Sequence, residues 1–442
     1  MPVSPPRVLG VGAIGFASFN CIVGAGIFGL PAPIAALLGP AAVLGYLICT
    51  VLIGLVGLCL AECGSRVCAA GGTYAYASAA FGPVMAGIVG TMSWITNIAG
   101  SAAVANLWVD TLAAQWPSTA APGARVGLLL AVYLALAVLN VRGARQGARA
   151  SSVFAAAKLA PLLVIVVVGL FALHPANLHW TAVPSTQSLG EAAVLLFFAF
   201  CGVESGLTTS GEARDPARTV PRAILFACTL IAALYIGIQV VSQGVLGVAL
   251  PHSSAPLVEV ASSLLGPWGA RLMIACIILS TLGYLVADLL CSPRALFALA
   301  ERAQLPRSLA AVHPRFRTPH VAVGVHAALC ALLAVSGSFR ALALFTSSTV
   351  LVVYAVCCLG VLRLRALRIE QCGTPFIVPG GVLVPVAAAA LVGFLFASLS
   401  RTELLATLGP VLISGLIYAF LDRRRSRRGT GTAVESTTPL NP

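Results

Sequence analysis

The sequence predicts an all-α polytopic membrane protein, and three observations support this fold class. Hydrophobic residues make up 59% of the 442 residues and charged residues only 9%. The mean hydropathy is +1.00. Soluble globular domains are about 45–50% apolar and about 25% charged, so a soluble chain of this length could not cover its surface. Long apolar segments recur along the chain, each close to the roughly 20 residues that a helix needs to cross the hydrocarbon core.

Twelve such segments are expected to form transmembrane helices. They lie at residues 11–37, 41–63, 84–113, 125–141, 152–173, 189–211, 221–247, 259–290, 319–336, 341–362, 381–400 and 403–421. The third and eighth segments are longer than one crossing requires, so we expect these helices to tilt or to extend beyond the hydrocarbon. Residues 1–10 form an N-terminal segment, and residues 422–442, which contain RRRSRR, are expected to be a disordered basic tail.

The distribution of basic residues predicts the orientation in the membrane. If the N-terminus is cytoplasmic, all but four of the 26 basic residues lie on the cytoplasmic side; the exceptions are Arg125, Arg271, Arg340 and Arg401. Cytoplasmic loops carry an excess of Lys and Arg, so we expect a multi-pass protein of the plasma (inner) membrane with both termini in the cytoplasm. Topology and attraction to anionic lipid then explain the net charge of +13, and no nucleic acid partner is expected.

The first segment contains GAGIFG at residues 24–29, which matches the G-x-G-x-x-G spacing of dinucleotide-binding turns. Such a turn follows a strand and precedes an acidic residue by about 20 positions. Here the flanks are continuously apolar, and the first acidic residue is Glu62. A P-loop is excluded because the only lysine, Lys158, is not part of a G-K-[ST] sequence. H-E-x-x-H and G-x-S-x-G are also absent, so we expect neither an enzyme nor a cofactor.

Cysteine and histidine usage points to no metal site. The 13 cysteines are odd in number, include no C-x-x-C pair and lie mostly in apolar segments, where thiols behave as small hydrophobic groups. We therefore expect no disulfides. The six histidines lie mainly in loops, with His326 alone in an apolar segment, and we expect solvated or packing roles for them.

The glycines of GAGIFG predict a break in the first helix. Gly24, Gly26 and Gly29 are followed by Pro31 and Pro33, and glycine costs about 1 kcal/mol relative to alanine in a helix interior. Irregular backbone at membrane depth is tolerated only where it lines a protein cavity. The alternative is a continuous helix whose small residues allow close packing against a neighbour.

A second interrupted segment occupies the corresponding place later in the chain. It reads EAAVLLFFAFCGVESGLTTSGE, with glycines at 202, 206 and 211 and a carboxylate at Glu204. Paired interrupted segments indicate a transporter site. The N–H groups of a half-helix attract an anion, and carbonyl groups at the opposing end attract a cation. Such a site suits a zwitterion such as an amino acid.

At this point the residues resemble the amino acid–polyamine–organocation transporters, and among them the arginine/agmatine-antiporter-like branch. The similarity covers most of residues 11–310 and lies in the following blocks: IVGAGIFGLPAPIA, AECGSRVCAAGGTYAYASAAFGP, WITNIAG, FAFCGVESGLTTSGEARDPARTVPRAI and SPRALFALAERAQLP. The resemblance implies a leucine-transporter-type fold of 5+5 helices, with residues 11–173 and 189–362 as inverted repeats. Helices 1 and 6 would be unwound at mid-membrane, and residues 381–421 would add two peripheral helices.

The resemblance also implies the substrate-binding residues. The unwound backbone of the first helix would hold the substrate carboxylate, carbonyls of both unwound segments would hold the ammonium, two aromatic rings would form a gate, and a polar side chain on the third helix would line the pocket. In that order these residues are Ala25, Gly26 and Ile27; Ile22, Phe200 and Cys201; Phe198 and Phe200; and Asn97. Gly24, Gly202, Glu204 and Asp288 are also expected in the substrate site.

Asp288 departs from the family pattern, because relatives often have an aromatic residue there. A buried acidic residue in a membrane segment usually faces a cavity or a partner. If Asp288 faces the pocket, it would favour a lysine-like, arginine-like or polyamine substrate. Alternatively, Asp288 pairs with a nearby basic residue such as Arg294, or lies in the cytoplasmic vestibule.

Two residues are candidates for proton coupling. Lys158 lies about seven residues inside the fifth segment, and a lysine ammonium, unlike a guanidinium, can lose its proton in a protein. Some proton-coupled relatives carry a lysine in a similar context, where its ammonium replaces a bound sodium ion. Glu204 is the second candidate. The alternatives are a lysine whose ammonium reaches the lipid headgroups and a glutamate that only hydrogen-bonds the unwound backbone.

The sequence therefore predicts a secondary active amino acid transporter that works by alternating access and is linked to protons. The first alternative is an antiporter for basic amino acids or polyamines; the second, of another class, is a membrane-embedded sensor without turnover. The expected partners are an amino acid or polyamine, protons and membrane lipids, and a homodimer is one assembly compatible with the resemblance. The sequence also predicts that Glu62 and Arg66 form a structural pair at the end of the second helix.

Overall fold

The computed structural model describes residues 10–12, 15, 19, 22–67, 71–142, 147–180, 183–203, 216–301, 305–371 and 374–429. Within these ranges the regular structure is entirely helical. The helices are α2 (Gly26–Gly29), α3 (Pro31–Leu38), α4 (Ala42–Arg66), α5 (Thr73–Phe81), α6 (Pro83–Gln115), α7 (Pro122–Arg142), α8 (Gly147–Leu170), α9 (Thr186–Phe200), α11 (Pro216–Leu246), α12 (Pro256–Glu301), α13 (His320–Ser336), α14 (Phe339–Ala366), α15 (Leu383–Ala397) and α16 (Arg401–Gly429).

Short 3₁₀ segments connect several of these helices. They are η1 (Gly39–Ala41), η2 (Pro117–Ala120), η3 (Pro175–Leu178), η5 (Gly247–His252) and η6 (Arg307–Ala310). Most begin at or just after proline or glycine, as expected for residues that end one helix or start the next.

The all-α polytopic class is confirmed. Among the described residues, seven helices are long and apolar enough to cross a membrane, and they span residues 31–66, 83–115, 122–142, 218–252, 256–301, 339–366 and 401–423. Shorter apolar helices cover residues 158–170, 186–200, 320–336 and 383–397. Each of the twelve predicted segments coincides with at least one helix. The crossing of the membrane by twelve helices and the 5+5 repeat remain predictions.

Helix α12 is long because it consists of two helices joined by a bend at a glycine and a proline. Its 46 residues are two helices joined at Gly266, which has φ 66° and ψ −159° and is followed by Pro267. A positive φ is strained for residues with a side chain but not for glycine. The long eighth segment of the sequence is therefore bent, in addition to any tilt in the membrane.

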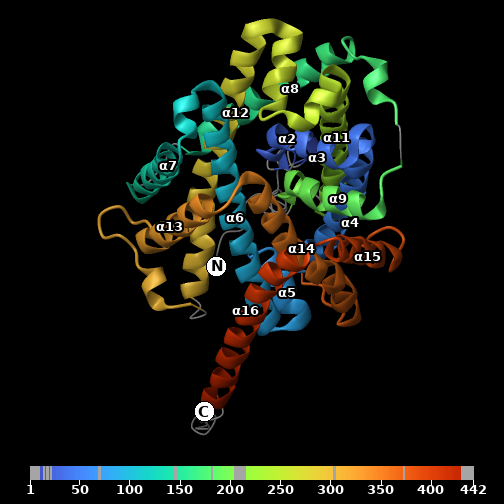
Figure 1. Ribbon diagram of the computed structural model, residues 1–442. Helices are drawn as coiled ribbons and strands as arrows, with labels where there is room; N and C mark the ends of the chain where they lie inside the picture. The colour runs from blue at the N-terminus through green and yellow to red at the C-terminus, as the bar shows by residue number, and fades with distance from the viewer. Residues whose placement is uncertain are drawn as a thin grey trace, which may run out of the picture.

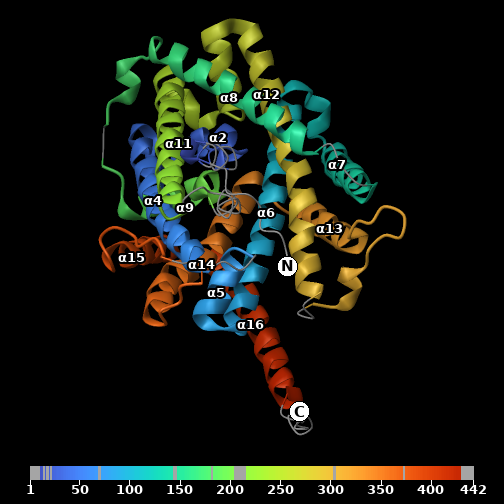
Figure 2. The same ribbon diagram turned by 180° about the vertical axis from the view of Figure 1, so that it is seen from behind.

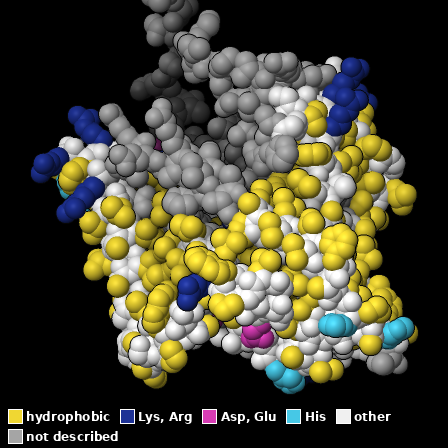
Figure 3. Space-filling view, turned by 90° about the horizontal axis from the view of Figure 1, so that it is seen from above, with side chains coloured by type: hydrophobic (Ala, Val, Ile, Leu, Met, Phe, Trp, Pro, Cys, Tyr) yellow, Lys and Arg dark blue, Asp and Glu magenta, His cyan; other side chains and the backbone are white. Residues whose placement is uncertain are grey.

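Helix α6 occupies the centre of the bundle. It packs against α5, α12, α13, α14 and α16, while α4 packs against α9, α11 and α14. Figures 1 and 2 show α7 and α13 at one edge and the C-terminal part of α16 extending away from the other helices. On the part of the face in Figure 3 that is not drawn in grey, hydrophobic side chains are widespread and charged groups are few. This surface agrees with a protein surrounded by lipid.

A buried ion-pair network lies at the C-terminal end of α4 and connects it to α14. Glu62 is fully buried and accepts hydrogen bonds from Arg365 Nε and Nη2 at 2.7 and 2.6 Å, from Arg66 Nε at 3.0 Å and from the Val378 backbone N–H at 2.9 Å. The expected Glu62–Arg66 pair is present, and Arg365 of α14 is a further partner that the sequence did not indicate. A buried carboxylate is tolerated when its lone pairs are all satisfied in this way.

Candidate functional site

The helix break predicted in the first segment is present. Residues 23–25 form bends and a turn, and helical structure resumes at Gly26. Leu30 separates the four-residue α2 from α3, which begins at Pro31. The first N–H groups of a helix have no acceptor within the helix. The break therefore leaves backbone donors at its start and the carbonyl groups of Ile22 and Val23 before it.

A second break follows α9. The helix ends at Phe200, Cys201 has an extended backbone (φ −65°, ψ 150°), and Gly202 has φ 113°. These angles turn the chain out of the helix directly after the two phenylalanines of FAF. We call residues 23–25 together with residues 201–202 the break site.

The two breaks lie against each other, as the neighbouring positions of α2 and α9 in Figures 1 and 2 indicate. A Cβ atom on Gly26 would be 2.8 Å from both Cα and Cβ of Ala199, so any side chain at position 26 would overlap the last turn of α9. Gly24 differs, because a Cβ there would meet only the Ile22 carbonyl oxygen, at 3.7 Å. Gly26 therefore serves the contact between the helices, whereas a Cβ on Gly24 would meet no other atom within 4 Å among the residues that the structure describes.

Tyr235 of α11 links the two breaks. Its hydroxyl lies 3.2 Å from the Ile22 carbonyl oxygen and 3.0 Å from that of Ala199. The ring packs edge-on against Phe200, with centroids 5.2 Å apart. The single hydrogen of this hydroxyl is thus shared between two carbonyl groups, one at each break. Sequence reasoning did not identify Tyr235; the available signal was a polar atom near the middle of an apolar segment.

Lys158 of α8 lies at the first break. Its ammonium donates a hydrogen bond to the Val23 carbonyl oxygen. The thiol of Cys276 on α12 lies 3.5 Å from the Lys158 carbonyl oxygen and donates to it. The Lys158 side chain therefore connects α8 with the first break, and its backbone carbonyl meets α12; the role of the ammonium between the first, fifth and eighth helices stays a prediction. The side chain does not extend away from the bundle.

The two candidate gate residues have different surroundings. Phe200 is fully buried beneath Tyr235. Phe198 is 9% exposed and packs edge-on against Phe339 of α14, with centroids 5.8 Å apart. Phe198 also contacts the backbone at Gly26, where a Cβ would be 3.1 Å from its ring. Of the pair, Phe198 is the ring that borders the first break.

Two further candidates are less well defined by contacts. Asn97 is half-buried on α6 and has no hydrogen-bond partner within the ranges that the structure describes. Glu204 lies outside the described residues. Ala25 and Ile27 are buried at the break itself.

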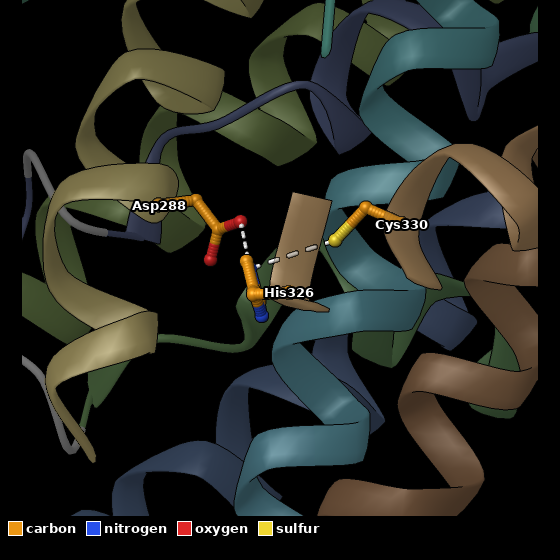
Figure 4. A group of neighbouring side chains, drawn as sticks. All are labelled: Asp288, His326 and Cys330. Carbon is orange, nitrogen blue, oxygen red and sulfur yellow. Dashed lines mark hydrogen bonds and ion pairs between the residues drawn. The ribbon is translucent and has the colours of Figure 1, made fainter. Parts of the chain in front are cut away.

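Asp288 belongs to a different polar group. Its Oδ1 accepts a hydrogen bond from Ser292 at 2.5 Å, and its Oδ2 lies 3.0 Å from His326 Nε2 on α13 (Figure 4). Trp94 of α6 donates to the other ring nitrogen of His326, Nδ1, at 3.1 Å. We call Asp288, Ser292, His326 and Trp94 the Asp288 cluster. Arg294, the partner considered from the sequence, is exposed and forms no ion pair with Asp288.

The Asp288 cluster corrects one expectation about the histidines. His326 was expected to be a packing residue, but its two nitrogens both form hydrogen bonds and its side chain is fully buried. Cys330 lies 3.5 Å from the same Nε2. These residues come from three helices and are far apart in the sequence, so no local pattern groups them.

Comparisons with known proteins agree with the features described above. A family model described as amino acid permease matches residues 9–419. An uncharacterised transporter of Mycobacterium tuberculosis is 33% identical over 338 residues, which cover 76% of this chain and 75% of the relative. The branched-chain amino acid permease BcaP of Bacillus subtilis is 25% identical over 440 residues, 95% of this chain and 94% of the relative. The serine/threonine exchanger SteT of Bacillus subtilis is 30% identical over 324 residues, 71% and 73%.

Proposed function

The chain belongs to the amino acid permease family, and from this premise we propose that it is a secondary active amino acid transporter working by alternating access. It is a multi-pass membrane protein whose relatives are transporters and not enzymes. The observation that carries the proposal is the break site. Two interrupted helices, 178 residues apart from Gly24 to Gly202, meet within the helix bundle and share the hydroxyl of Tyr235.

The substrate is proposed to bind through its two charged groups. The backbone N–H groups around Ala25, Gly26 and Ile27 would receive the carboxylate, because the start of a helix presents unpaired donors and a positive dipole end. The carbonyl groups of Ile22, Phe200 and Cys201 would receive the ammonium, and Gly202 gives that segment its turn. Among the described residues only the Ile22 carbonyl oxygen would lie within 4 Å of a Cβ at Gly24, which supports this arrangement, since a substrate needs room beside the backbone.

Phe198 and Asn97 are proposed to complete the pocket. Phe198 is the less buried of the two phenylalanines and borders Gly26, which suits a ring that covers a bound substrate. Asn97 has an amide without a partner in the described part of the chain, which is a group able to contact the substrate. The ring of Phe200 packs against Tyr235 and is proposed to support the second break, while its backbone carbonyl is proposed to receive the ammonium.

We propose that transport is linked to protons through Lys158. The ammonium binds the Val23 carbonyl at the first break, where it acts as a fixed cation. Loss of its proton would remove the charge and weaken the hydrogen bond to the Val23 carbonyl, because a neutral amine is a poorer donor than an ammonium, and so change the backbone that holds the substrate. Glu204 remains a second candidate on sequence grounds alone.

A neutral amino acid is the favoured substrate. Asp288, the residue that favoured a basic substrate, uses both carboxylate oxygens within its own cluster. The names of similar proteins differ in substrate: BcaP and SteT are named for branched-chain amino acids and for serine and threonine, and a transporter of Mus musculus is named for cationic amino acids. An antiporter for basic amino acids or polyamines is the second proposal and would need Asp288 to leave its present partners.

The orientation proposed from the basic residues places both termini in the cytoplasm and the chain in the inner membrane. Accessibility of single cysteines introduced at the four outward-facing arginine positions, tested with a membrane-impermeant reagent in intact cells, would check it. We expect labelling at these positions and none at a cysteine introduced near Arg423.

Counterflow in proteoliposomes tests the function. Vesicles containing the purified chain are loaded with one unlabelled compound, and uptake of the labelled compound is measured for neutral amino acids, basic amino acids and polyamines, with and without a pH gradient. We expect counterflow with a neutral amino acid and stimulation by an inward proton gradient. Exchange restricted to basic compounds would support the antiporter instead. Specific binding without counterflow of any compound would show a sensor and reject transport.

A further inference from the structure

The Asp288 cluster offers one position for an additional proton. We propose that Asp288 is a proton-binding site, that the proton resides on the carboxylate oxygen facing Ser292, and that Trp94 confines it there by holding His326 as a neutral hydrogen-bond donor. The link between this proton and transport rests on the proposed function, whereas binding of the proton does not. The site is separate from Lys158.

The partners of His326 determine its protonation state. Trp94 Nε1 lies 3.1 Å from His326 Nδ1, and an indole N–H can only donate a hydrogen bond. Nδ1 therefore carries a lone pair, and the hydrogen of the neutral ring is on Nε2. Nε2 lies 3.0 Å from Asp288 Oδ2 and donates to it (Figure 4). A single hydrogen bond from Trp94 thus selects the tautomer.

Three atoms could accept an added proton, and two of them are blocked. A proton on His326 Nδ1 would point at the Trp94 N–H. A proton on Asp288 Oδ2 would point at the His326 Nε2–H, and reversing that tautomer would again place a hydrogen on Nδ1. Oδ1 remains, because its partner is the rotatable hydroxyl of Ser292 at 2.5 Å. Ser292 can turn, accept from the protonated Oδ1 and donate to the Asp288 backbone carbonyl one helical turn earlier.

Binding a proton would neutralise the buried negative charge of Asp288. The side chain is 4% exposed, and no Lys or Arg forms an ion pair with it in the described ranges. Its two hydrogen-bond donors, Ser292 and His326, are both neutral. A buried charge inside a membrane protein is costly unless it is paired. A proton on Oδ1 removes the charge while every hydrogen bond of the cluster is kept.

The same tautomer argues against a metal ion. Asp288, His326 and Cys330 bring three ligand atoms within 4.8 Å of one another, which by spacing alone would suit zinc. When Nε2 binds a metal, Nδ1 donates its hydrogen to an acceptor. Here Trp94 presents a donor to Nδ1, so metal binding would set two N–H groups against each other.

The other titratable or charged groups around Asp288 can be assigned to each neighbouring helix. Helix α6 contributes Trp94 and Ser101, which do not change charge near neutral pH. The remaining groups are Cys291 on α12, Cys330 on α13 and Tyr133 on α7, with Tyr284 next to Tyr133 and Arg294 next to Cys291. Lys158 meets α12 at Cys276, which at 1.5 Å per residue is ~18 Å along the helix from Asp288.

Spectroscopy on the purified full chain tests proton binding without any transport assay. Infrared difference spectra recorded from about pH 4 to about pH 9 should show a carboxylic-acid carbonyl band that grows as the pH falls and is missing in Asp288→Asn. In Ser292→Ala the band should remain but shift in frequency, because its hydrogen-bond partner is gone. Absence of any band that depends on Asp288 would overturn the proposal.

Nitrogen-15 NMR of histidine-labelled protein tests the role of Trp94. The His326 signal, assigned by its loss in His326→Gln, should report a neutral ring with the hydrogen on Nε2 from about pH 5 to about pH 8, the range in which histidine ordinarily changes charge. In Trp94→Phe the ring should titrate. Trp108→Phe is the matched control, because the Trp108 indole on the same helix has no hydrogen-bond partner within the described ranges. A His326 ring that titrates in the unmodified protein, or that binds added zinc, would contradict the proposal.

Transport assays then test whether the proton on Asp288 is coupled to transport. Trp94→Phe should add a pH-dependent step of at least about 3-fold between about pH 5 and 8, and Trp94→Phe combined with His326→Gln should remove that step. If the chain transports no amino acid, the infrared and NMR results still decide whether Asp288 binds a proton. If it transports but Asp288→Asn keeps the complete pH profile, the link between this proton and transport is wrong.

Discussion

The break site and the Asp288 cluster are two polar regions inside one apolar helix bundle, and they are built from different parts of the chain. At and beside the break site the polar groups belong to the backbone, namely the carbonyls of Ile22, Val23 and Ala199, and within the described ranges the side chains that hydrogen-bond them are Lys158 and Tyr235. The Asp288 cluster consists of side chains on intact stretches of α6, α12 and α13.

This difference separates two tasks. Backbone groups that are freed from a helix recognise charges that every amino acid shares, so the break site suits binding of a substrate's carboxylate and ammonium. A closed set of side chains leaves no group for a substrate, but its protonation can change. Substitutions of the break-site backbone should therefore lower transport at every pH, substitutions of Lys158 should lower transport and also change its dependence on pH, and substitutions in the Asp288 cluster should mainly change the dependence on pH.

Gly26→Ala should have the largest effect. The new methyl group would lie 2.8 Å from the backbone of Ala199 and push the two breaks apart. Overpacking of this kind costs about 1–3 kcal/mol, and we expect counterflow to fall by about 100-fold. Gly54→Ala on α4 is the control, because nothing lies within 4 Å of a Cβ there, and it should retain transport. Equal activity of the two variants would show that the breaks need not touch.

Lys158→Met should have the second-largest effect on transport. It removes the ammonium that binds the Val23 carbonyl, and hydrogen bonds from charged groups contribute about 1.5–3 kcal/mol. We expect counterflow to fall by about 10- to 50-fold and the remaining activity to lose most of its pH dependence. Lys158→Arg keeps the charge but cannot deprotonate, so it should bind substrate and respond less to pH. An unchanged pH profile in Lys158→Arg would exclude a coupling role.

Tyr235→Phe should have a smaller effect of about 5-fold. It deletes only the hydroxyl that joins Ile22 and Ala199, worth about 1 kcal/mol, and keeps the ring against Phe200. Tyr418→Phe is the matched control, because its hydroxyl contacts Thr91, 3.1 Å away, on the face of α6 next to α16. A greater loss in the control would mean that the break site depends little on Tyr235.

Cys330→Ala should have the smallest effect. The thiol lies 3.5 Å from His326 Nε2, a nitrogen whose hydrogen already binds Asp288, so the cluster keeps all its hydrogen bonds without it. We expect less than about 2-fold change in counterflow at any pH. A shifted pH profile would show that the thiol takes part in the cluster.

The sequence was sufficient to predict the helical class, both breaks and the position of Lys158, because each depends on a local signal. Several glycines, with two prolines after them in the first segment, favour a helix break, and a lone lysine in an apolar segment is conspicuous. Tyr235 was missed, because a tyrosine in an apolar segment is usually a packing residue. Its hydrogen bonds to the carbonyls of Ile22 and Ala199 become visible only in the folded structure. The Asp288 cluster was missed for a different reason: Trp94 and His326 are 232 residues apart, and only the packing of α6 against α13 brings them together.

Competition in the counterflow assay tests the central claim that the break site binds the two charged groups of an amino acid. Uptake of the preferred labelled substrate is measured with an excess of the same amino acid, of its carboxamide and of its N-acetyl derivative. We predict that the free amino acid competes fully and that both derivatives lose competition by at least about 100-fold, since each lacks one charge that the backbone groups receive. Competition by the carboxamide or the N-acetyl derivative at the same concentration as the free amino acid would contradict the account.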